Sequence, residues 1–216
     1  MIKKNNIGKH LGIIRRYKMK VDFEKSKTKI NLARSFSAEC MEGAKYQFMA
    51  KQAETQELAY LKSTLKTLAK HEMSHAKVFW DYLQDNAKKV ENNIDMTYGY
   101  PFECGELVDN FKFHAKNELE LSDHIYPAFA KIAKDEGYDD IAQSFKLIAM
   151  VENCHSALLD QIYTKLKGKK LYKSQHSQKW KCNQCGYEHT AKQAWDTCPL
   201  CKYPQGYVEI PLDMGN

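Results

Sequence analysis

The sequence of 216 residues predicts an all-α four-helix bundle followed by a small metal domain with four cysteine ligands. Three observations predict this fold. Four segments repeat apolar residues at steps of three and four, each segment carries an acid inside its apolar stripe, and two C-x-x-C pairs stand near the C-terminus. Because a carboxylate in an apolar stripe is costly to bury without compensation, the bundle is expected to enclose a metal site.

The last of the four stripes, over residues 141–166, shows the pattern most plainly. Glu152 and His155 lie in phase with its apolar residues. The spacing Glu-x-x-His puts a carboxylate and an imidazole on one helix face, one turn apart, where both can hold the same ion. Taken alone, such a pair is more often a salt bridge or a surface pair than a pair of ligands.

The other three stripes, over residues 32–50, 61–82 and 107–125, supply matching polar residues. The second of them repeats Glu-x-x-His, and the other two each carry one acid in phase with the apolar positions. The six candidate ligands, in chain order, are Glu39, Glu72, His75, Glu118, Glu152 and His155. This is the ligand set of a carboxylate-bridged dinuclear iron or manganese centre in a four-helix bundle.

The connections between the stripes predict the topology. The helices are expected over residues 26–53 and 57–83, from about residue 106, and up to residue 166. Pro127 should kink the third helix or begin a new segment, and Asp139 or Asp140 is expected to cap the fourth. One long connection, over residues 84–105, and two short ones give the ferritin-like arrangement.

Composition divides the chain into four parts. Residues 1–20 hold seven basic and no acidic residues and are expected to be a disordered extension rather than a targeting sequence. Residues 21–168 are assigned to the bundle, the polar residues 169–178 to a linker, and residues 179–216 to the second metal domain. Without the basic extension the net charge is −1, which argues against binding to nucleic acid.

The second metal domain is predicted from two C-x-x-C pairs separated by twelve residues. Its four candidate ligands are Cys182, Cys185, Cys198 and Cys201. Four thiolates on two tight turns make a tetrahedral site for zinc or for a single iron. Gly186 and Pro199 favour iron, since a glycine after the first pair lets backbone N–H groups approach the sulfurs and tune a redox potential. A structural zinc ribbon is the alternative.

Apolar runs and cysteine usage bear on location. No run approaches the roughly 20 apolar residues that a membrane-spanning helix needs, so a membrane protein is not expected. Cys40, Cys104 and Cys154 stand singly in helical or connecting segments. This usage favours metal thiolates and a reducing compartment over disulfides, and we expect a cytoplasmic protein.

From about residue 20 onward the chain resembles a rubrerythrin, in which a ferritin-like bundle precedes a rubredoxin-like domain. The resemblance rests on Phe36-Ser-Ala-Glu39, Glu72-Met-Ser-His75-Ala-Lys, Glu118 followed by Tyr126-Pro127, Glu152-Asn-Cys-His155, Trp180-x-Cys-x-x-Cys-Gly-Tyr and Cys198-Pro-x-Cys201. It implies a non-haem di-iron peroxidase that reduces hydrogen peroxide to water. It also implies an upstream reductase as electron donor and a head-to-tail homodimer, in which the rubredoxin-like iron of one subunit lies near the di-iron site of the other.

The resemblance also implies roles for single residues. Tyr46 and Tyr126 would hydrogen-bond the ligand carboxylates, although ordinary bundle packing explains them equally well. In the expected mechanism Glu72 and Glu152 bridge the two irons, since two ions about 3.5–4 Å apart can clamp both peroxide oxygens. His75 would complete one end of the centre, and His155 would complete the other.

One position departs from the family pattern. Rubrerythrins usually carry a further Glu three residues after the one that matches Glu118, and here that residue is Leu121. Glu120 lies about 200° around the helix and points away. His114, one turn before Glu118, is either an outer ligand or, as is commoner, a packed and hydrogen-bonded core histidine. The missing Glu favours a second function, an oxidase or ferroxidase that uses O2, and storage or structural metal binding is a third.

Overall fold

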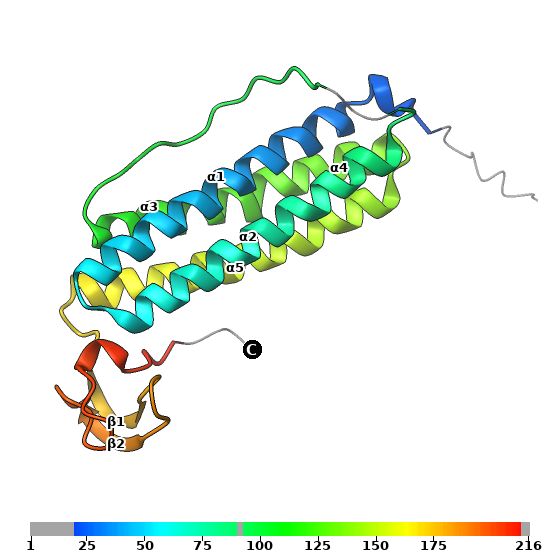
Figure 1. Cartoon of the computed structure of the whole chain (residues 1–216). Coiled ribbons are helices and arrows are strands. Elements are labelled where there is room, and N and C mark those ends of the chain that lie inside the picture. The colour runs from blue at the N-terminus through cyan, green and yellow to red at the C-terminus, as the bar shows by residue number, and fades with distance from the viewer. Residues whose placement is uncertain (1–19, 90–92, 213–216) are drawn as a thin grey trace, which may run out of the picture.

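The computed structural model describes residues 20–89 and 93–212, and the expected extension over residues 1–20 lies outside them except for Lys20. Four bundle rods run roughly parallel to one axis, with a small β domain at one end (Figure 1). The rods are α1 (Lys27–Thr55), α2 (Ala59–Asn86), α3 (Leu107–Glu120) continued by α4 (Tyr126–Asp135), and α5 (Asp139–Lys167). None of these helices carries an apolar stretch long enough to cross a bilayer. The predicted ferritin-like bundle is therefore confirmed.

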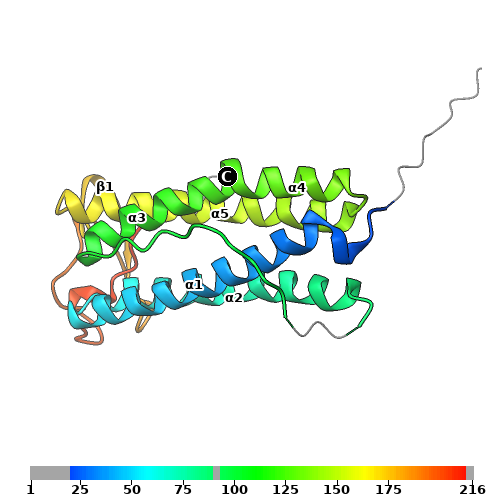
Figure 2. The same cartoon turned by 90° about the horizontal axis from the view of Figure 1, so that it is seen from above.

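The long connection predicted between the second and third helices runs the length of the bundle. Figure 2 shows it passing over the seam between α1 and α3, on its way from one end of the molecule to the other. Side chains of residues 98–104 line cavities together with residues of α1, so the segment packs on that seam. The crossover places α1 and α2 as one antiparallel pair and α3–α4 and α5 as the other.

The third rod is interrupted before Pro127. A single π-helical turn, η2 (Leu121–Ile125), separates α3 from α4, and the Tyr126 N–H bonds the Leu121 carbonyl five residues back. Proline has no N–H and cannot close the usual bond to the residue four positions back, so the ladder changes register just before it. Pro127 thus follows a π turn and stands near the start of a new segment, which is the second of the two predicted outcomes.

The predicted cap of the last helix was wrong. Tyr138 is the N-cap residue of α5 and no side chain caps the helix, while Asp139 and Asp140 lie inside its first turn. Gly137, at φ +87°, ends the preceding turn in a backbone conformation that glycine adopts without strain. The two aspartates still favour the helix, because acids near an N-terminus interact well with the helix dipole.

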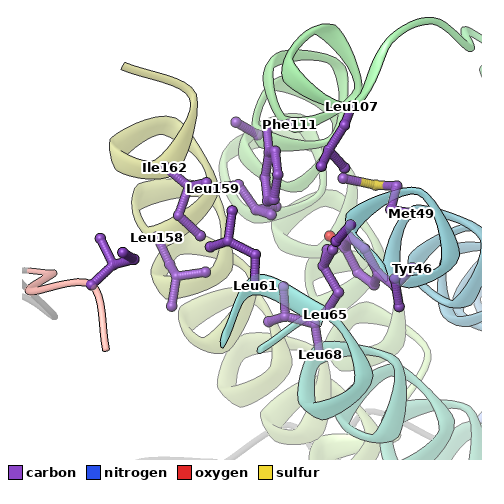
Figure 3. Packing of buried hydrophobic residues seen from close by; sticks show 14 of the residues in the cluster. Tyr46, Met49, Leu61, Leu65, Leu68, Leu107, Phe111, Leu158, Leu159 and Ile162 are labelled. Carbon is purple, nitrogen blue, oxygen red and sulfur yellow. The ribbon is translucent and has the colours of Figure 1, made fainter. Parts of the chain in front are cut away.

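The core of the bundle consists of two apolar clusters on either side of the central acids. The cluster nearer the β domain joins all four rods; Figure 3 shows Tyr46, Met49, Leu61, Leu65, Leu68, Leu107, Phe111, Leu158, Leu159 and Ile162 pointing toward one another. The second cluster contains Phe79, Tyr126 and Phe145 and fills the opposite half. Burial of each large apolar side chain contributes about 1.5–3 kcal/mol, so the central polar layer lies between two strongly stabilised segments.

The C-terminal domain is a two-stranded antiparallel hairpin of β1 (Lys173–Lys181) and β2 (Glu188–Gln193), followed by the short 3-10 helix η3 (Gln205–Tyr207). Residues 173–178, which composition predicted as linker, belong to β1. Their side chains are mostly exposed on both faces, so the segment lacks the alternating apolar pattern by which a strand is recognised.

The domain packs against the end of its own bundle. Leu171 and Ile210 are buried in the apolar cluster with helix residues. Gly206 of η3 lies so close to the backbone carbonyl of Glu57, in the α1–α2 connection, that any Cβ there would overlap it. Only glycine permits this approach, so the domain packs closely beside the start of α2.

A carboxylate from the α4–α5 connection caps the start of α1. Glu136 accepts hydrogen bonds from the backbone N–H groups of Lys27 and Thr28, at 3.0 and 2.9 Å, and from the Thr28 hydroxyl at 2.6 Å. Partial burial raises the pKa of Glu136, but these hydrogen bonds outweigh burial and hold it below the usual 4.5. The carboxylate thus joins the two halves of the bundle.

We expect Glu136→Gln to lower the free energy of unfolding of the metal-free protein by about 1–2 kcal/mol at pH 7. Because the folded pKa lies below the unfolded value, the carboxylate stabilises the fold above pH 4.5, and this contribution is lost as the pH falls through the lowered pKa. The difference between wild type and variant in urea unfolding should therefore vanish in acid. Glu103→Gln, at an exposed carboxylate, is the control, and an equal loss there would contradict the assignment.

Candidate metal centres

Four buried carboxylates meet in the polar layer between the two apolar clusters. Each comes from a different rod, and each is at most 1% exposed: Glu39 from α1, Glu72 from α2, Glu118 from α3 and Glu152 from α5. The helical period carries them there, because each lies in phase with an apolar stripe that faces the core. A cluster of four buried acids is strongly unfavourable unless cations or protons balance it.

The candidate ligand atoms form two groups that share two carboxylates. Within each group, one ligand atom from every member lies within 4.8 Å of the others. The first group consists of Glu39, Glu72, His75 and Glu152, and the second of Glu72, Glu118, Glu152 and His155. Membership of Glu72 and Glu152 in both groups is the arrangement that carboxylates bridging two ions require.

Both histidines turn Nδ1 into the cluster. His75 Nδ1 lies 2.8 Å from Glu152 Oε1 and 3.1 Å from Glu72 Oε2. His155 Nδ1 lies 2.8 Å from Glu152 Oε2 and 3.1 Å from Glu72 Oε1. Two atoms that each bind one ion at about 2.1 Å, nearly at right angles, are about 3 Å apart. These separations therefore match those of ligand atoms around shared ions.

Several buried atoms of these groups make no hydrogen bond of good geometry within the described residues, even where a histidine nitrogen lies 2.8–3.1 Å from a carboxylate oxygen. They are both carboxylate oxygens of Glu152, Oε1 of Glu72, Oε2 of Glu118 and Nδ1 of His155. An unsatisfied buried polar atom costs about 1–3 kcal/mol. Bound cations would satisfy all five, and oxygen with imidazole ligands suits iron. The residues present thus fit two iron ions.

Protonation follows from burial and from the histidines. Burial raises the pKa of Glu39 and Glu118 well above the usual 4.5. Burial also acts to raise the pKa of Glu72, but close contacts with the two histidines outweigh it and lower the value to about 2. Burial lowers the pKa of His75, and close contacts with three carboxylates overcome this and raise it to about 12. Metal binding must displace these protons, so affinity for metal should rise with pH.

Two tyrosines hold the outer carboxylates. The Tyr46 hydroxyl donates to Glu118 Oε1, and the Tyr126 hydroxyl donates to Glu39 Oε1. Both rings are fully buried, and burial raises the pKa of each phenol well above 10, so each hydroxyl keeps its proton and donates it. Each outer carboxylate therefore has one oxygen held by a tyrosine and the other facing a metal position.

His71 contacts the site and was not among the sequence candidates. Its Nδ1 lies 3.2 Å from Nε2 of His155, and the two rings stack with centroids 5.4 Å apart. An outer partner at one ring nitrogen fixes the tautomer of a ligand histidine, which leaves its Nδ1 free to bind an ion. The sequence gives only a weak indication of this role. His71 precedes His75 by one turn of α2, but the histidine that it contacts is His155 of α5.

The structure places His114 away from both groups. The residue is buried, and its Nδ1 lies 2.7 Å from Oε2 of Glu42, whose Oε1 accepts a bond from the Tyr100 hydroxyl at 2.7 Å. His114 is therefore the packed, hydrogen-bonded core histidine of the two predicted alternatives. Glu120 is exposed and lies in neither group, as its helical position predicts, and Leu121 is half-buried.

The four cysteines of the C-terminal domain converge on one point. Their sulfurs lie within 4.8 Å of one another, with Cys182–Cys201 at 3.7 Å and Cys185–Cys198 at 3.8 Å. Sulfurs bound tetrahedrally to one ion at about 2.3 Å are about 3.8 Å apart, whereas disulfide sulfurs are about 2.0 Å apart. The group thus fits one iron or one zinc ion.

Backbone N–H groups surround the sulfurs. Burial raises the pKa of Cys198, but backbone hydrogen bonds from Cys201 and Leu200 outweigh it and lower the value to about 7, which favours the thiolate. Gly186, directly after the first pair, adopts φ +76° and closes the turn through its N–H to the Cys182 carbonyl. The position needs the left-handed conformation that glycine adopts freely.

Comparison with known proteins agrees with both sites. A family model described as Rubrerythrin matches residues 31–163 and 116–183, and one described as Rubrerythrin, rubredoxin-like domain matches residues 180–209. The chain is 32% identical over 185 residues to Rubrerythrin-1 of Clostridium acetobutylicum, covering 86% of this chain and 94% of that one. The rubrerythrin of Clostridium perfringens is 29% identical over 186 residues, with the same coverage. The fully reduced, all-ferrous nigerythrin structure has the same fold, with a TM-score of 0.56 at 21% identity over 90% of this chain and 96% of that one.

Proposed function

Because the chain belongs to the rubrerythrin family of di-iron oxidoreductases, we propose that it is a non-haem peroxidase that reduces hydrogen peroxide to water. One observation carries the proposal. Two groups of buried ligand atoms share Glu72 and Glu152, so two ions would lie side by side. Two neighbouring ions can bind both oxygen atoms of a peroxide. A structural metal needs no such pair of neighbouring positions.

Two irons in the bundle supply, when bound, the electron pair that an O–O bond needs, and one iron at four thiolates supplies the one-electron chemistry that restores it. The side chains around these positions have three roles, which are to hold the ions, to orient the ligands and to exclude water. Glu72 and Glu152, which belong to both ligand groups, would hold both ions and balance their charge, while His75 and His155 would each hold one. Tyr46 and Tyr126 orient the outer carboxylates through their hydroxyl protons, and the apolar clusters on both sides exclude water.

The supply of electrons supports a head-to-tail homodimer. The C-terminal domain touches its own bundle near Glu57, and α2 rises about 20 Å from Ala59 to Glu72 at 1.5 Å per residue. Electron transfer slows steeply with distance, so a second subunit that brings its four-cysteine site beside the bundle layer would shorten the path. We further propose that an upstream reductase feeds this site, in the reducing cytoplasm.

Steady-state turnover tests the proposal. With a rubredoxin reductase and NADH as reductant, hydrogen peroxide should be consumed much faster than O2. We expect Cys198→Ser to abolish this turnover while it leaves intact one stoichiometric oxidation of the pre-reduced bundle site by peroxide, followed optically. Loss of the single oxidation as well would refute the relay role of the cysteine site, and faster consumption of O2 than of peroxide would refute the peroxidase.

Leu121 favours the alternative, an oxidase or ferroxidase that uses O2. The side chain is half-buried in the π turn, one turn beyond Glu118, where the family pattern has a further carboxylate. We expect Leu121→Glu to change kcat/KM for peroxide by about tenfold or more, because it restores the carboxylate of the family pattern one turn beyond Glu118. Glu120→Gln, at the exposed neighbour, should have little effect. Equal effects in stopped-flow kinetics would show that a carboxylate at position 121 has no special role.

A further inference from the structure

A cavity of about 410 Å³ lies beside the metal layer. It is lined by α1, by crossover residues 98–101 and by the end of α3 with the π turn and α4, where Figure 2 shows the crossover passing over the α1–α3 seam. One water molecule occupies about 30 Å³ in the liquid, so the cavity is several times larger than hydrogen peroxide needs. Its volume lies within the range of sites that bind organic molecules.

One wall of the cavity is apolar and connects to the metal layer through Tyr126. Leu121, Ile125 and Phe129 line the cavity, and so does Tyr126, whose hydroxyl donates to Glu39. A molecule in the cavity therefore contacts a side chain that itself contacts a candidate metal ligand. Leu121 makes this wall apolar, whereas a glutamate at the same position would place a charge in it.

Polar groups without partners mark another part of the wall. Ser35 is 2% exposed, and its Oγ has no hydrogen-bond partner; Nε of Arg34 is likewise buried and unsatisfied. Over residues 20–89 and 93–212, no acidic side chain pairs with Arg34. A guanidinium in a cavity wall is a strong recognition site for a carboxylate, and a hydroxyl in the same wall can donate a further hydrogen bond.

Two of the charged side chains that line the cavity lie well apart on α1. Arg34 and Glu42, which both line the cavity, are eight residues apart on α1, which corresponds to about 12 Å. The Glu42 carboxylate is already bound by His114 and Tyr100, and the other acid in the wall, Glu120, is exposed. The cavity is thus elongated, apolar for most of its length and open to an anion at Arg34.

We propose that this cavity binds an alkyl hydroperoxide that carries a carboxylate, with the carboxylate on Arg34 and Ser35 and the apolar chain against Leu121 and Phe129. The inference rests on the proposed peroxidase function and names a second substrate class for the same centre. Reduction breaks the O–O bond of R–O–OH, takes up two electrons and two protons, and yields R–OH and water. The electrons come from the same one-electron protein donor as for hydrogen peroxide.

Binding can be tested apart from activity. Dodecanoic acid, an unreactive probe, is titrated into the full-length iron-loaded protein by isothermal calorimetry, with dodecan-1-ol as the uncharged comparison. We expect one saturable site for the acid, with weaker binding of the alcohol. Arg34→Gln should weaken binding of the acid about tenfold or more, with little change for the alcohol. Lys66→Gln, which removes an exposed charge on α2, is the matched control.

A second variant addresses the apolar part. Ala38→Leu extends a side chain into the cavity and should weaken acid and alcohol alike, with an unfolding curve to verify the fold. Equal binding of the acid by wild type, Arg34→Gln and Ala38→Leu would overturn the site. Binding of both probes that depends on Ala38 but not on Arg34 would overturn the choice of a carboxylate.

Turnover then separates this inference from the function on which it rests. A fatty-acid hydroperoxide and hydrogen peroxide are compared with the same reductant. We expect both to be reduced, and Arg34→Gln to lower the ratio of their kcat/KM values about tenfold or more in favour of hydrogen peroxide. Reduction of hydrogen peroxide alone would refute the inference and leave the proposed function standing. Reduction of neither would refute the proposed function itself.

Discussion

Glu152→Gln is expected to remove iron from the bundle and to leave iron at the four cysteines. Glu152 belongs to both ligand groups, and each of its oxygens lies 2.8 Å from a candidate histidine ligand without a hydrogen bond of good geometry in the described part of the chain. Glutamine keeps the volume of the side chain but cannot bridge two cations with negative oxygens. Peroxide turnover should fall about a thousandfold or more, the scale of losing about 4 kcal/mol of electrostatic stabilisation.

The metal-free form of the same variant should also be less stable. Burial raises the pKa of Glu39 and Glu118 well above 4.5, so these two acids are neutral, and Glu72 and Glu152 balance the charges of His75 and His155. Glutamine at position 152 removes the charge that both histidines contact at 2.8 Å, so the free energy of unfolding should fall by about 3–5 kcal/mol. Leu65→Ala should cost about 2–5 kcal/mol through the cavity it creates, but it should keep its bundle iron.

Elemental analysis and urea unfolding check both expectations. Glu42→Gln is the matched control, because Glu42 of α1 is buried like Glu152 but lies in neither ligand group. This control should keep its bundle iron. Iron retained in Glu152→Gln, or lost equally in Glu42→Gln, would contradict the assignment of Glu152 as the shared ligand.

The candidate ligands could be proposed from sequence because helical phase is a local property. Residues three and four apart lie on one face, so an acid such as Glu118 in step with Phe111 must enter the core with it. The structure brings all six candidates together in two groups. The cysteine site was predictable for a similar reason, since two residues between cysteines permit one tight turn to offer both sulfurs.

Contacts between distant segments were not predictable in this way. The bond from Tyr100 to Glu42 depends on the path of the crossover, and the contact of His71 with His155 depends on which faces of α2 and α5 meet. Neither is encoded in a short spacing. The large cavity is of the same kind, because its walls come from three segments that no local pattern brings together.

Local exceptions also arose where two signals competed. The proline at position 127 predicted a break but not its form, and the break became a π turn over Leu121–Ile125. The polar stretch after α5 read as a linker, yet pairing with β2 makes its second half a strand. Backbone pairing in an exposed hairpin needs no apolar alternation, so composition alone could not reveal it.

A mixed dimer of two inactive variants is expected to regain peroxidase turnover. One chain carries Cys198→Ser and keeps its bundle site, and the other carries Glu152→Gln and keeps its cysteine site. The cysteine domain is seated near Glu57, about 20 Å along α2 from Glu72, and Gly206 holds it there without room for a Cβ. If electrons cross between subunits of a two-fold dimer, the one intact cysteine site serves the one intact bundle site, and turnover per dimer is about half that of wild type.

The reciprocal pairing makes the result decisive. A dimer of one wild-type chain with one chain carrying both substitutions contains the same sites, but both intact sites then lie in one subunit. Transfer between subunits predicts no turnover for this pairing, and transfer within a subunit predicts about half of wild type for it and none for the first. Differently tagged chains, co-expressed and purified in tandem, supply both dimers for one assay with NADH and reductase. Activity in the reciprocal dimer alone would mean that each bundle is reduced by its own cysteine domain. That domain would then have to move away from the contact between Gly206 and Glu57.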